Sequence, residues 1–212
     1  MPGDVVPYRL GKRVLDKAIS GALLVLLSPL LVAVVAAIGL DMVFARRDRG
    51  PWLYRERRIS RGREFDLLKF RVLRRDALGR AREEGHARLH EVDPENLTWA
   101  GRRILKPWYL DELPQLINIL RGDMSLVGPR PWPLSMVHSQ VAAGCDYRNL
   151  VMAGWTGPAQ VRKGIGADDD AELDLAYAEA CRAWRGTRLA RFDLGILWQT
   201  IGVLRRGEGL DY

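Results

Sequence analysis

The chain of 212 residues contains little cysteine and little histidine. Its two cysteines, Cys145 and Cys181, are too few for a disulfide framework, and nothing in the sequence indicates an oxidising compartment. Three histidines (His86, His90 and His138) without a Cys-x-x-Cys pair give no zinc-binding pattern. The disulfide-stapled secreted proteins and the zinc proteins are therefore excluded as classes.

Charged residues are absent from residues 18–40. A straight helix of this length spans a bilayer core of about 30 Å. Ser28-Pro29 lies in the middle, where proline removes a helix hydrogen bond, and the serine hydroxyl is placed to satisfy the freed backbone group. Each half, of roughly 11 residues or about 16 Å, is too short to cross alone. The pattern favours a re-entrant helix broken at Ser28-Pro29.

Basic residues flank this apolar segment on both sides. They are Arg9, Lys12, Arg13 and Lys17 before it, and Arg46, Arg47 and Arg49 after it. Because positive residues prefer the cytoplasmic side, we expect both ends to stay there. An ordinary kinked single span is the alternative. A cleaved signal peptide is disfavoured, because the apolar stretch is too long and starts too late.

The net charge of +7 admits nucleic acid, an anionic membrane surface or phosphate-rich substrates as partners. The basic residues are dispersed and interrupted by acids, whereas a nucleic-acid surface needs a basic stripe with stacking aromatics. We therefore expect no nucleic acid.

Two adjacent carboxylates, Asp111 and Glu112, precede Pro114 and an apolar run. Proline is tolerated in the first turn of a helix, so the pattern predicts a helix from Pro114 to Arg121 that stops at Gly122. Free N–H groups and the helix dipole at its start favour negative charge. Such a carboxylate is ionised at neutral pH, ready to hold a cation or attack an electrophile. An acidic decoration of a helix start is the alternative reading.

Residues 50–55 and 65–71 read as two short strands joined by a turn around Ser60-Arg61-Gly62. Lys69 and Arg71 share one strand face, as either phosphate contacts or a solvated basic edge. The highly charged residues 74–98 predict an exposed loop and a short helix.

Gly128-Pro129-Arg130-Pro131 is stiff, because two prolines fix φ on either side of one arginine. The planar guanidinium suits a phosphate or a uracil edge; a rigid turn with a solvated arginine is the alternative. Near the C-terminus, an apolar stripe recurs at helical spacing and predicts either a core helix or an interfacial one. Its residues are Leu189, Phe192, Ile196, Trp198, Ile201 and Leu204.

Three motifs stand out in the sequence: Lys69-Phe70-Arg71, residues 110–116 (Leu-Asp-Glu-Leu-Pro-Gln-Leu) and residues 122–131 (Gly-Asp-Met-Ser-Leu-Val-Gly-Pro-Arg-Pro). Together they closely resemble the motifs of the bacterial sugar transferases called monotopic phosphoglycosyl transferases. The resemblance extends from about Lys12 to about Leu204. It implies an α+β, predominantly helical, monotopic membrane protein with an N-terminal re-entrant helix and a small β-hairpin. Residues 1–45 are expected to form the membrane helix with its basic flanks, and residues 46–212 the catalytic domain.

The resemblance implies transfer of a phosphosugar from a UDP-sugar to polyprenol (undecaprenyl) phosphate through a covalent aspartyl-phosphosugar intermediate, with release of UMP. Asp111 and Glu112 are expected to be catalytic and to hold Mg²⁺, for which Mn²⁺ substitutes. Residues expected to bind substrate phosphates are Lys69, Arg71, Arg103, Lys106, Pro129, Arg130 and Pro131. The expected location is the cytoplasmic face of the bacterial inner membrane, in contact with membrane lipids. The sequence leaves the sugar and the oligomeric state open. The alternative is a membrane-anchored, non-enzymatic component of a polysaccharide assembly complex.

The chain departs from the family pattern at several positions. Lys106 stands where arginine is usual, and Tyr109 where a small hydroxyl residue is usual. In the loop at 154–161, Ala153, Trp155 and Pro158 replace proline, isoleucine and tryptophan. A lysine neutralises phosphate as a point charge rather than as a bidentate fork, so we expect substrate positioning to differ here.

Overall fold

The computed structural model describes residues 4–84, 87–162 and 167–206. Within these ranges the fold is mostly helical, as expected, with two small two-stranded sheets, of which only the hairpin was predicted. The chain divides into two compact units. Unit 1 comprises Met1–Ser20, Arg58–Phe65 and Ile119–Tyr212, and unit 2 comprises Gly21–Arg57 and Asp66–Asn118. The expected division into residues 1–45 and 46–212 stays a prediction.

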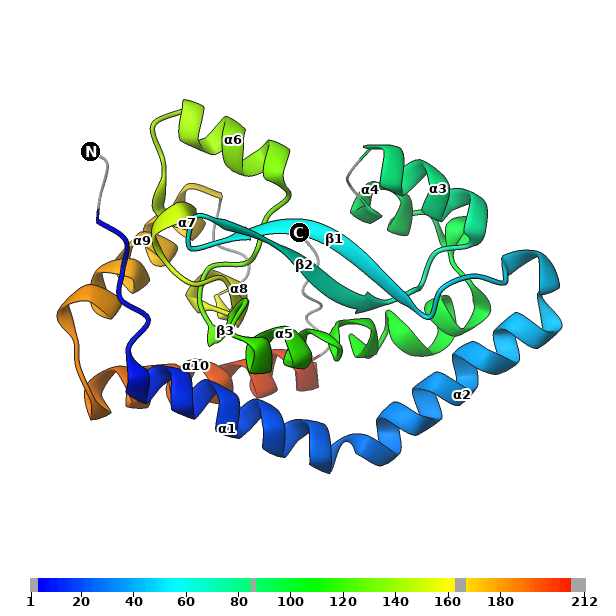
Figure 1. Cartoon of the computed structure of the whole chain (residues 1–212), viewed down its shortest axis with the longest axis horizontal. Coiled ribbons are helices and arrows are strands. Elements are labelled where there is room, and N and C mark those ends of the chain that lie inside the picture. Colours follow the sequence, from blue (N-terminus) through cyan, green and yellow to red (C-terminus); the bar gives the residue numbers. More distant parts are fainter. Residues whose placement is uncertain (1–3, 85–86, 163–166, 207–212) are drawn as a thin grey trace. The chain divides into compact units, whose positions relative to one another are not determined.

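The apolar N-terminal segment forms two helices, α1 (Leu10–Leu26) and α2 (Ser28–Phe44), which are bent by 62° at their junction (Figure 1). Pro29 has no N–H for the carbonyl oxygen of Val25, and the Ser28 hydroxyl donates to that oxygen instead, at 2.8 Å. The predicted break at Ser28-Pro29 is therefore confirmed. Among the described residues, no single helix is long and apolar enough to cross a membrane; α1 and α2 reach the required length and apolar composition only when taken together, as a broken span or a re-entrant loop.

A hairpin follows α2 and the short helix η1 (Arg46–Asp48). Its strands are β1 (Leu53–Ser60) and β2 (Arg63–Phe70), joined by the two-residue turn Arg61-Gly62. Both turn residues are left-handed, with φ of 51° and 71°. Such a turn matches the right-handed twist of paired strands, and it favours glycine because glycine has no Cβ. The predicted hairpin and its turn are confirmed.

The charged segment after the hairpin is more ordered than the sequence suggested. It forms α3 (Arg75–Glu84), α4 (Ala87–Glu91) and the 3₁₀ turn η2 (Pro94–Asn96). The expected short helix is present as α3, but the helix is not fully exposed, since Ala77, Leu78 and Ala81 are buried. These three small apolar residues recur at helical spacing among the charges and give α3 one face that packs inward.

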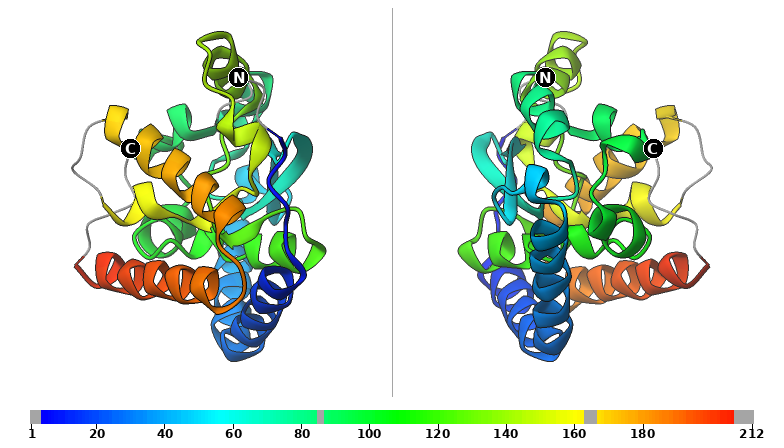
Figure 2. Two further views of the ribbon diagram at one scale, coloured as in Figure 1. Left: turned by 90° about the vertical axis from the view of Figure 1, so that its left-hand side faces the viewer. Right: turned by 90° about the vertical axis from the view of Figure 1, so that its right-hand side faces the viewer.

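In unit 1, β3 (Ser125–Val127) and β4 (Gly154–Thr156) pair in parallel, with Ser125 opposite Gly154 and Val127 opposite Thr156. Buried residues of β3, including Leu126, lie in the core of this unit. The helices of unit 1 that follow β3 are α6 (Leu134–Ala142), α7 (Tyr147–Leu150), α8 (Pro158–Val161), α9 (Ala167–Ala183) and α10 (Thr187–Arg206). Figure 2 shows α9 and α10 as successive helices joined by a short connection.

Helix α10 carries the predicted C-terminal stripe and divides it between two faces. Leu189 and Ile196 are buried, which confirms the core interpretation for them. Phe192 is 38% exposed and Trp198 is 75% exposed, and Ile201 and Leu204 are half-exposed as well. The helix therefore packs one face into unit 1 and leaves a second apolar face uncovered.

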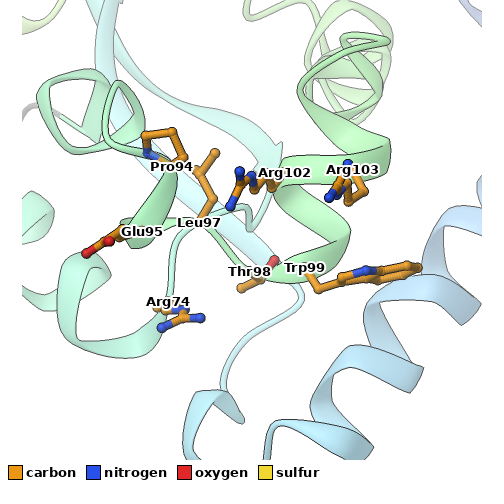
Figure 3. A pocket seen from close by; sticks show the side chains of 8 residues that line it. All are labelled: Arg74, Pro94, Glu95, Leu97, Thr98, Trp99, Arg102 and Arg103. Carbon is orange, nitrogen blue, oxygen red and sulfur yellow. The ribbon is translucent and has the colours of Figure 1, made fainter.

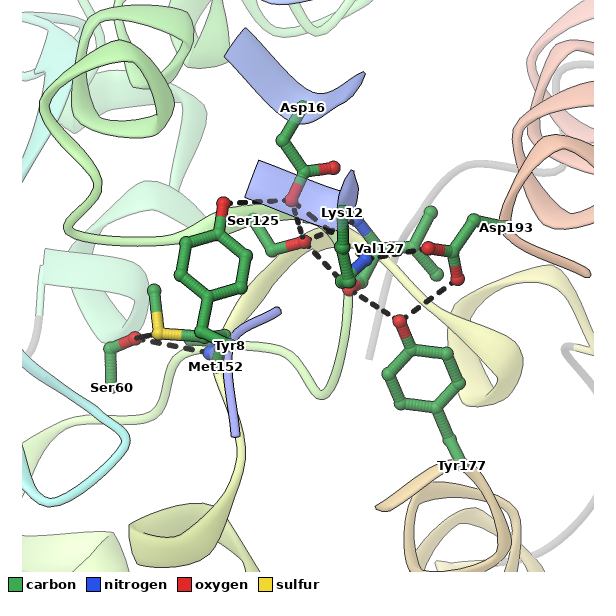
Figure 4. Close-up of polar contacts among 10 residues, drawn as sticks. Tyr8, Lys12, Asp16, Ser60, Ser125, Val127, Met152, Tyr177 and Asp193 are labelled. Atoms are coloured by element: carbon green, nitrogen blue, oxygen red, sulfur yellow. Dashed lines mark hydrogen bonds and ion pairs between the residues drawn. The ribbon is translucent and has the colours of Figure 1, made fainter. Parts of the chain in front are cut away.

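Three buried ionised groups join the start of α1 to α10 within unit 1 (Figure 4). The Lys12 ammonium lies 2.6 Å from Asp193 Oδ2 and 3.8 Å from Asp16 Oδ2. The lysine side chain is 8% exposed, and those of Asp16 and Asp193 are 2% and 3% exposed. Buried charges of this kind require partners, so the three side chains hold α1 and α10 together.

Hydroxyl groups complete this network, which we call the Lys12 network. The hydroxyls of Tyr8 and Ser125 donate to Asp16 Oδ2 at 2.9 and 2.6 Å. The Tyr177 hydroxyl lies 2.9 Å from Asp193 Oδ1 and 2.9 Å from the carbonyl oxygen of Val127. The network therefore also fixes the end of β3.

Candidate active site

The two adjacent carboxylates lie on a short 3₁₀ turn, η4 (Leu110–Glu112), directly before helix α5 (Gln115–Arg121). The turn begins after Tyr109, whose φ of 54° is left-handed and redirects the chain. Asp111 is 1% exposed and Glu112 is also buried. The predicted helix is confirmed to within one residue at its start, and it ends before Gly122 as expected.

Lys106 is the nearest cation to the first of these carboxylates. Its ammonium nitrogen lies 3.5 Å from Asp111 Oδ2 and 2.5 Å from Glu91 Oε2. Lys106 follows the π-helix η3 (Gly101–Leu105), and its backbone N–H donates to the carbonyl oxygen of Gly101 at 3.0 Å. This wide turn sets the lysine between the two acids, five residues before Asp111.

The hairpin adds a second lysine and a further acid to the charged side chains around Asp111. Lys69 on β2 lies 3.7 Å from Glu56 Oε2 on β1, and both side chains are buried. Glu56 Oε1 in turn accepts a hydrogen bond from the backbone N–H of Ala87 at the start of α4. Strand alternation explains the burial, because it puts Glu56 on the same face as the buried Tyr54.

Burial has the largest effect on the pKa of Asp111. It raises the pKa of this carboxyl to about 6, an effect that Lys106 opposes and the neighbouring Glu112 reinforces. Glu91 behaves differently: burial acts to raise its pKa, but Lys69 and Lys106 outweigh burial and the pKa is lowered. Asp111 is therefore mostly ionised at neutral pH while remaining poorly solvated, which suits a carboxylate that attacks an electrophile.

Six charged side chains of unit 2 interact around Asp111. The acids are Glu56, Glu91, Asp111 and Glu112, and the cations are Lys69 and Lys106.

Among the described residues, no three acidic, histidine or cysteine side chains are grouped so that they hold a metal ion by themselves. Mg²⁺ is commonly held by one or two carboxylates with waters and substrate phosphates. The two adjacent oxygen donors Asp111 and Glu112 fit such a partial set.

Arg71 and Arg103, the other predicted phosphate ligands in unit 2, differ in whether their guanidinium groups are free to contact a substrate. Arg71 is buried, and its guanidinium donates to the carbonyl oxygens of Asp48, Pro51 and Leu73 at 2.7, 3.0 and 2.9 Å. All three nitrogens are committed to the backbone, so the geometry favours a structural role for Arg71 over the expected phosphate contact. Arg103, on η3, is exposed.

Pro129, Arg130 and Pro131 belong to unit 1, where they follow β3. Both prolines are buried and Arg130 is half-buried. The buried Arg148 donates to the carbonyl oxygen of Arg130 at 2.6 Å, and its guanidinium stacks 3.8 Å from the ring centre of Trp132. The expected rigidity therefore comes from Arg148 as well as from the prolines.

The loop at 154–161 keeps close backbone contact with the segment that carries Arg130. The N–H of Gly154 donates to the carbonyl oxygen of Pro129 at 2.8 Å, and a Cβ on Gly154 would collide with the backbone of Gly128. Pro158 opens the short helix α8, a position where proline needs no N–H partner. The replacement of tryptophan by proline is thus accommodated by a helix start.

Sequence reasoning missed three residues of these sites. Glu91 reads as one of many solvated charges in residues 74–98, and Glu56 as a charge on a strand edge. Arg148 has no local signal at all. The alternation of β1 was the one sequence signal for Glu56, since it predicts a buried face that includes residue 56.

Comparison with known proteins agrees with the motifs. Residues 7–207 match the bacterial sugar transferase family. The chain is 36% identical to the UDP-glucose:undecaprenyl-phosphate glucose-1-phosphate transferase of Caulobacter vibrioides, over 96% of this chain and 74% of the relative. It is 34% identical to the UDP-galactose-lipid carrier transferase of Erwinia amylovora and to the undecaprenyl-phosphate galactose phosphotransferase of Salmonella typhimurium. Each of these two alignments covers 93% of this chain and 41% of the relative.

The match to the family spans nearly all of the described chain and includes both the Asp111 site and the Arg130 loop. The resemblance that the sequence motifs indicated is confirmed, and this chain belongs to the bacterial sugar transferase family.

Proposed function

We propose that this protein transfers a sugar phosphate from a UDP-sugar to polyprenol phosphate and releases UMP. The family and the names of the relatives support this reaction. The structural observation that carries the proposal is the buried carboxyl of Asp111, which lies 3.5 Å from the ammonium group of Lys106. The relatives named above use different sugars, so the proposal covers the reaction and leaves the sugar unassigned.

In the first step, an oxygen of Asp111 attacks the phosphorus that bears the sugar. The bond from this phosphorus to the oxygen that bridges the two phosphates breaks, and UMP leaves with the bond's electron pair. The product is an aspartyl-phosphosugar, a mixed acyl phosphate. In the second step, a phosphate oxygen of the polyprenol phosphate attacks the same phosphorus and frees the Asp111 carboxylate.

The lysines and the second acid assist both steps. Lys106, in contact with Asp111, offsets charge that develops on the transferred phosphate. Glu112 takes part in metal holding or accepts a proton from the incoming lipid phosphate. Arg130 presents its guanidinium to substrate phosphate from the rigid segment between two prolines, and Lys69 and Arg103 supply further positive charge.

Asp111 and Glu112 are the residues proposed to hold Mg²⁺, with Mn²⁺ as a substitute. Bound there, the ion supplies Lewis-acid neutralisation of the diphosphate and of the departing UMP. Without that neutralisation the anionic carboxylate is repelled by the anionic diphosphate.

The bent pair α1 and α2 is proposed to enter the membrane from the cytoplasmic face and return to it. The basic flanks on both sides and the satisfied break at Ser28-Pro29 support this topology. The exposed apolar face of α10, with Trp198 at its centre and Arg191 and Arg205 nearby, has the composition of a helix that lies in the membrane interface.

The decisive experiment incubates the purified protein with single UDP-sugars from a panel, without polyprenol phosphate. We expect UMP release equal in amount to the protein, and a labelled phosphosugar on the protein that hydroxylamine removes. Asp111→Asn should eliminate both signals, because a neutral amide is not this nucleophile, whereas the exposed-site control Asp76→Asn should retain them.

Two outcomes would count against the proposal. Labelling of the Asp111→Asn protein would show that Asp111 is not the nucleophile. Failure of every UDP-sugar to release UMP, with and without polyprenol phosphate, would favour the non-enzymatic role in a polysaccharide assembly complex.

A further inference from the structure

A pocket of about 430 Å³ lies in unit 2 beside the π-helix η3. Its lining includes three arginines, Arg74, Arg102 and Arg103, together with Glu95 and Trp99 (Figure 3). Its volume is within the range of small-ligand sites, roughly 300–1,000 Å³. The catalytic acids Asp111 and Glu112 do not line it.

The arginines make the pocket an anion site. In the part of the chain that the structure describes, no carboxylate lies within ion-pair distance of Arg102 or Arg103, and Arg74 meets only Asp48, at 3.7 Å. Once Glu95 in the lining and Asp48 beside Arg74 are both counted, the three guanidinium groups leave one excess positive charge. The planar fork of arginine pairs with two phosphate oxygens at once, so phosphate is the anion that this lining suits best.

The pocket lies close to the end of α2. The backbone N–H of Ala100 donates to Asp41 Oδ2, in the last turn of α2, at 3.1 Å. Trp99 is 59% exposed and extends from the pocket toward this helix (Figure 3). Phe44, the last residue of α2, is also exposed. Exposed indole rings beside arginines are typical of the boundary between lipid and water.

We infer that this pocket binds the phosphate of an anionic phospholipid headgroup at the membrane surface. The inference rests on the membrane attachment proposed above for α1 and α2. The apolar end of α2, the exposed indole of Trp99 and the guanidinium groups of Arg102 and Arg103 lie close together there, and a phospholipid carries the matching acyl chains and phosphate.

The pocket shares a helical turn, η3, with the lysine of the reaction centre. Arg102 and Arg103 belong to η3, and this π-turn closes on the backbone N–H of Lys106. A lipid phosphate held by Arg102 restricts the turn that carries Lys106 toward Asp111. The pocket therefore makes the setting of Lys106 dependent on anionic lipid.

The test measures lipid retention by native mass spectrometry of the full-length protein in detergent, with phosphatidylglycerol and phosphatidylcholine in competition. The pocket variant is Arg74→Gln/Arg102→Gln, and the matched control is Arg75→Gln/Arg82→Gln, which removes two exposed arginines of the same unit outside the pocket. All four side chains are exposed, and Arg74→Gln also removes the ion pair with Asp48, so circular dichroism verifies the fold of both variants.

We expect the wild-type protein and the control to prefer phosphatidylglycerol, and the pocket variant to lose about tenfold to thirtyfold of this preference. The estimate takes about 1 kcal/mol for each arginine near an anionic surface and 1.4 kcal/mol for each factor of ten. An equal loss in both variants would mean general charge attraction and would overturn the inference. Displacement of phosphatidylglycerol by UMP would assign the pocket to the nucleotide, and stronger retention of polyprenol phosphate would assign it to the acceptor.

Failure of the inference is distinguishable from failure of the proposed function. UMP release is measured on the same preparations. Release without any phospholipid preference removes the pocket assignment alone, while a preference for phosphatidylglycerol without UMP release under any condition removes the proposed reaction and keeps the lipid site.

Discussion

Replacement of Lys12 by methionine tests the energetics of the Lys12 network. Methionine keeps most of the unbranched apolar stem of lysine and removes the ammonium group, with its charge and its hydrogen bond to Asp193. Asp16 retains the hydroxyl groups of Tyr8 and Ser125, but Asp193 retains only that of Tyr177. The penalty therefore falls mainly on Asp193, a buried carboxylate left without its cation.

The size of this penalty is bounded by protonation. An unpaired buried carboxylate becomes neutral by binding a proton. At pH 7, protonation of a group with an ordinary pKa of about 3.9 costs about 4 kcal/mol of free energy. This value agrees with the loss of about 3–5 kcal/mol in stability that follows removal of one partner of a buried ion pair. At pH 5 the same protonation costs only about 1.5 kcal/mol, so Lys12→Met should destabilise the protein much less there.

The assay is urea unfolding in detergent micelles, followed by far-UV circular dichroism at both pH values. Arg13→Met, an exposed cation on the same helix, is the control and should change the free energy of unfolding by less than about 0.5 kcal/mol. Adding Asp193→Asn to Lys12→Met should recover more than half of the loss at pH 7. A loss of equal size at pH 5 and pH 7 would refute the electrostatic reasoning.

Three further predictions concern other parts of the chain. Burial raises the pKa of Asp174 to about 6, although Arg148 opposes this, so stability should fall as pH rises from about 4 to about 6. Asp174→Asn should flatten that slope in urea unfolding followed from pH 4 to pH 7; an unchanged slope would contradict it. Chelation with EDTA should abolish UMP release, and Mg²⁺ or Mn²⁺ should restore it; full turnover in excess EDTA would refute the metal role. Cysteines placed at the exposed positions Asp4 and Arg47, with Cys145 and Cys181 replaced by serine, should be labelled from the same side of the membrane. Labelling from opposite sides would mean a single span, and Pro29→Leu should produce that pattern by straightening the helix.

Local features of the sequence predicted local features of the structure well. Ser28-Pro29 predicted the break of the N-terminal helix, and Arg61-Gly62 predicted the turn of the hairpin, because each depends on the chemistry of a few neighbouring residues. The position of Asp111 and Glu112 before a helix was equally readable from Pro114.

Features that depend on distant partners were not readable. Glu91 is an ordinary surface acid until the chain folds and Lys106 lies against it. Arg71 has the spacing of a phosphate ligand, yet the backbone carbonyls of residues 48, 51 and 73 take its donors. A hydrogen-bond donor looks the same in a sequence whether its acceptor is a substrate or a backbone segment elsewhere in the fold.

The Lys12 network also sets an order of events during synthesis. Lys12 and Asp193 are 181 residues apart in the chain, so the lysine leaves the ribosome long before its carboxylate partner exists. At about 5–20 residues per second, the interval is about 10–40 s. The cation at the base of α1 is thus exposed to water while the apolar part of the helix is already available to the bilayer. In the membrane attachment proposed above, α1 therefore enters the bilayer before it is joined to α10, and the ion pair between Lys12 and Asp193 forms only after residue 193 has been made.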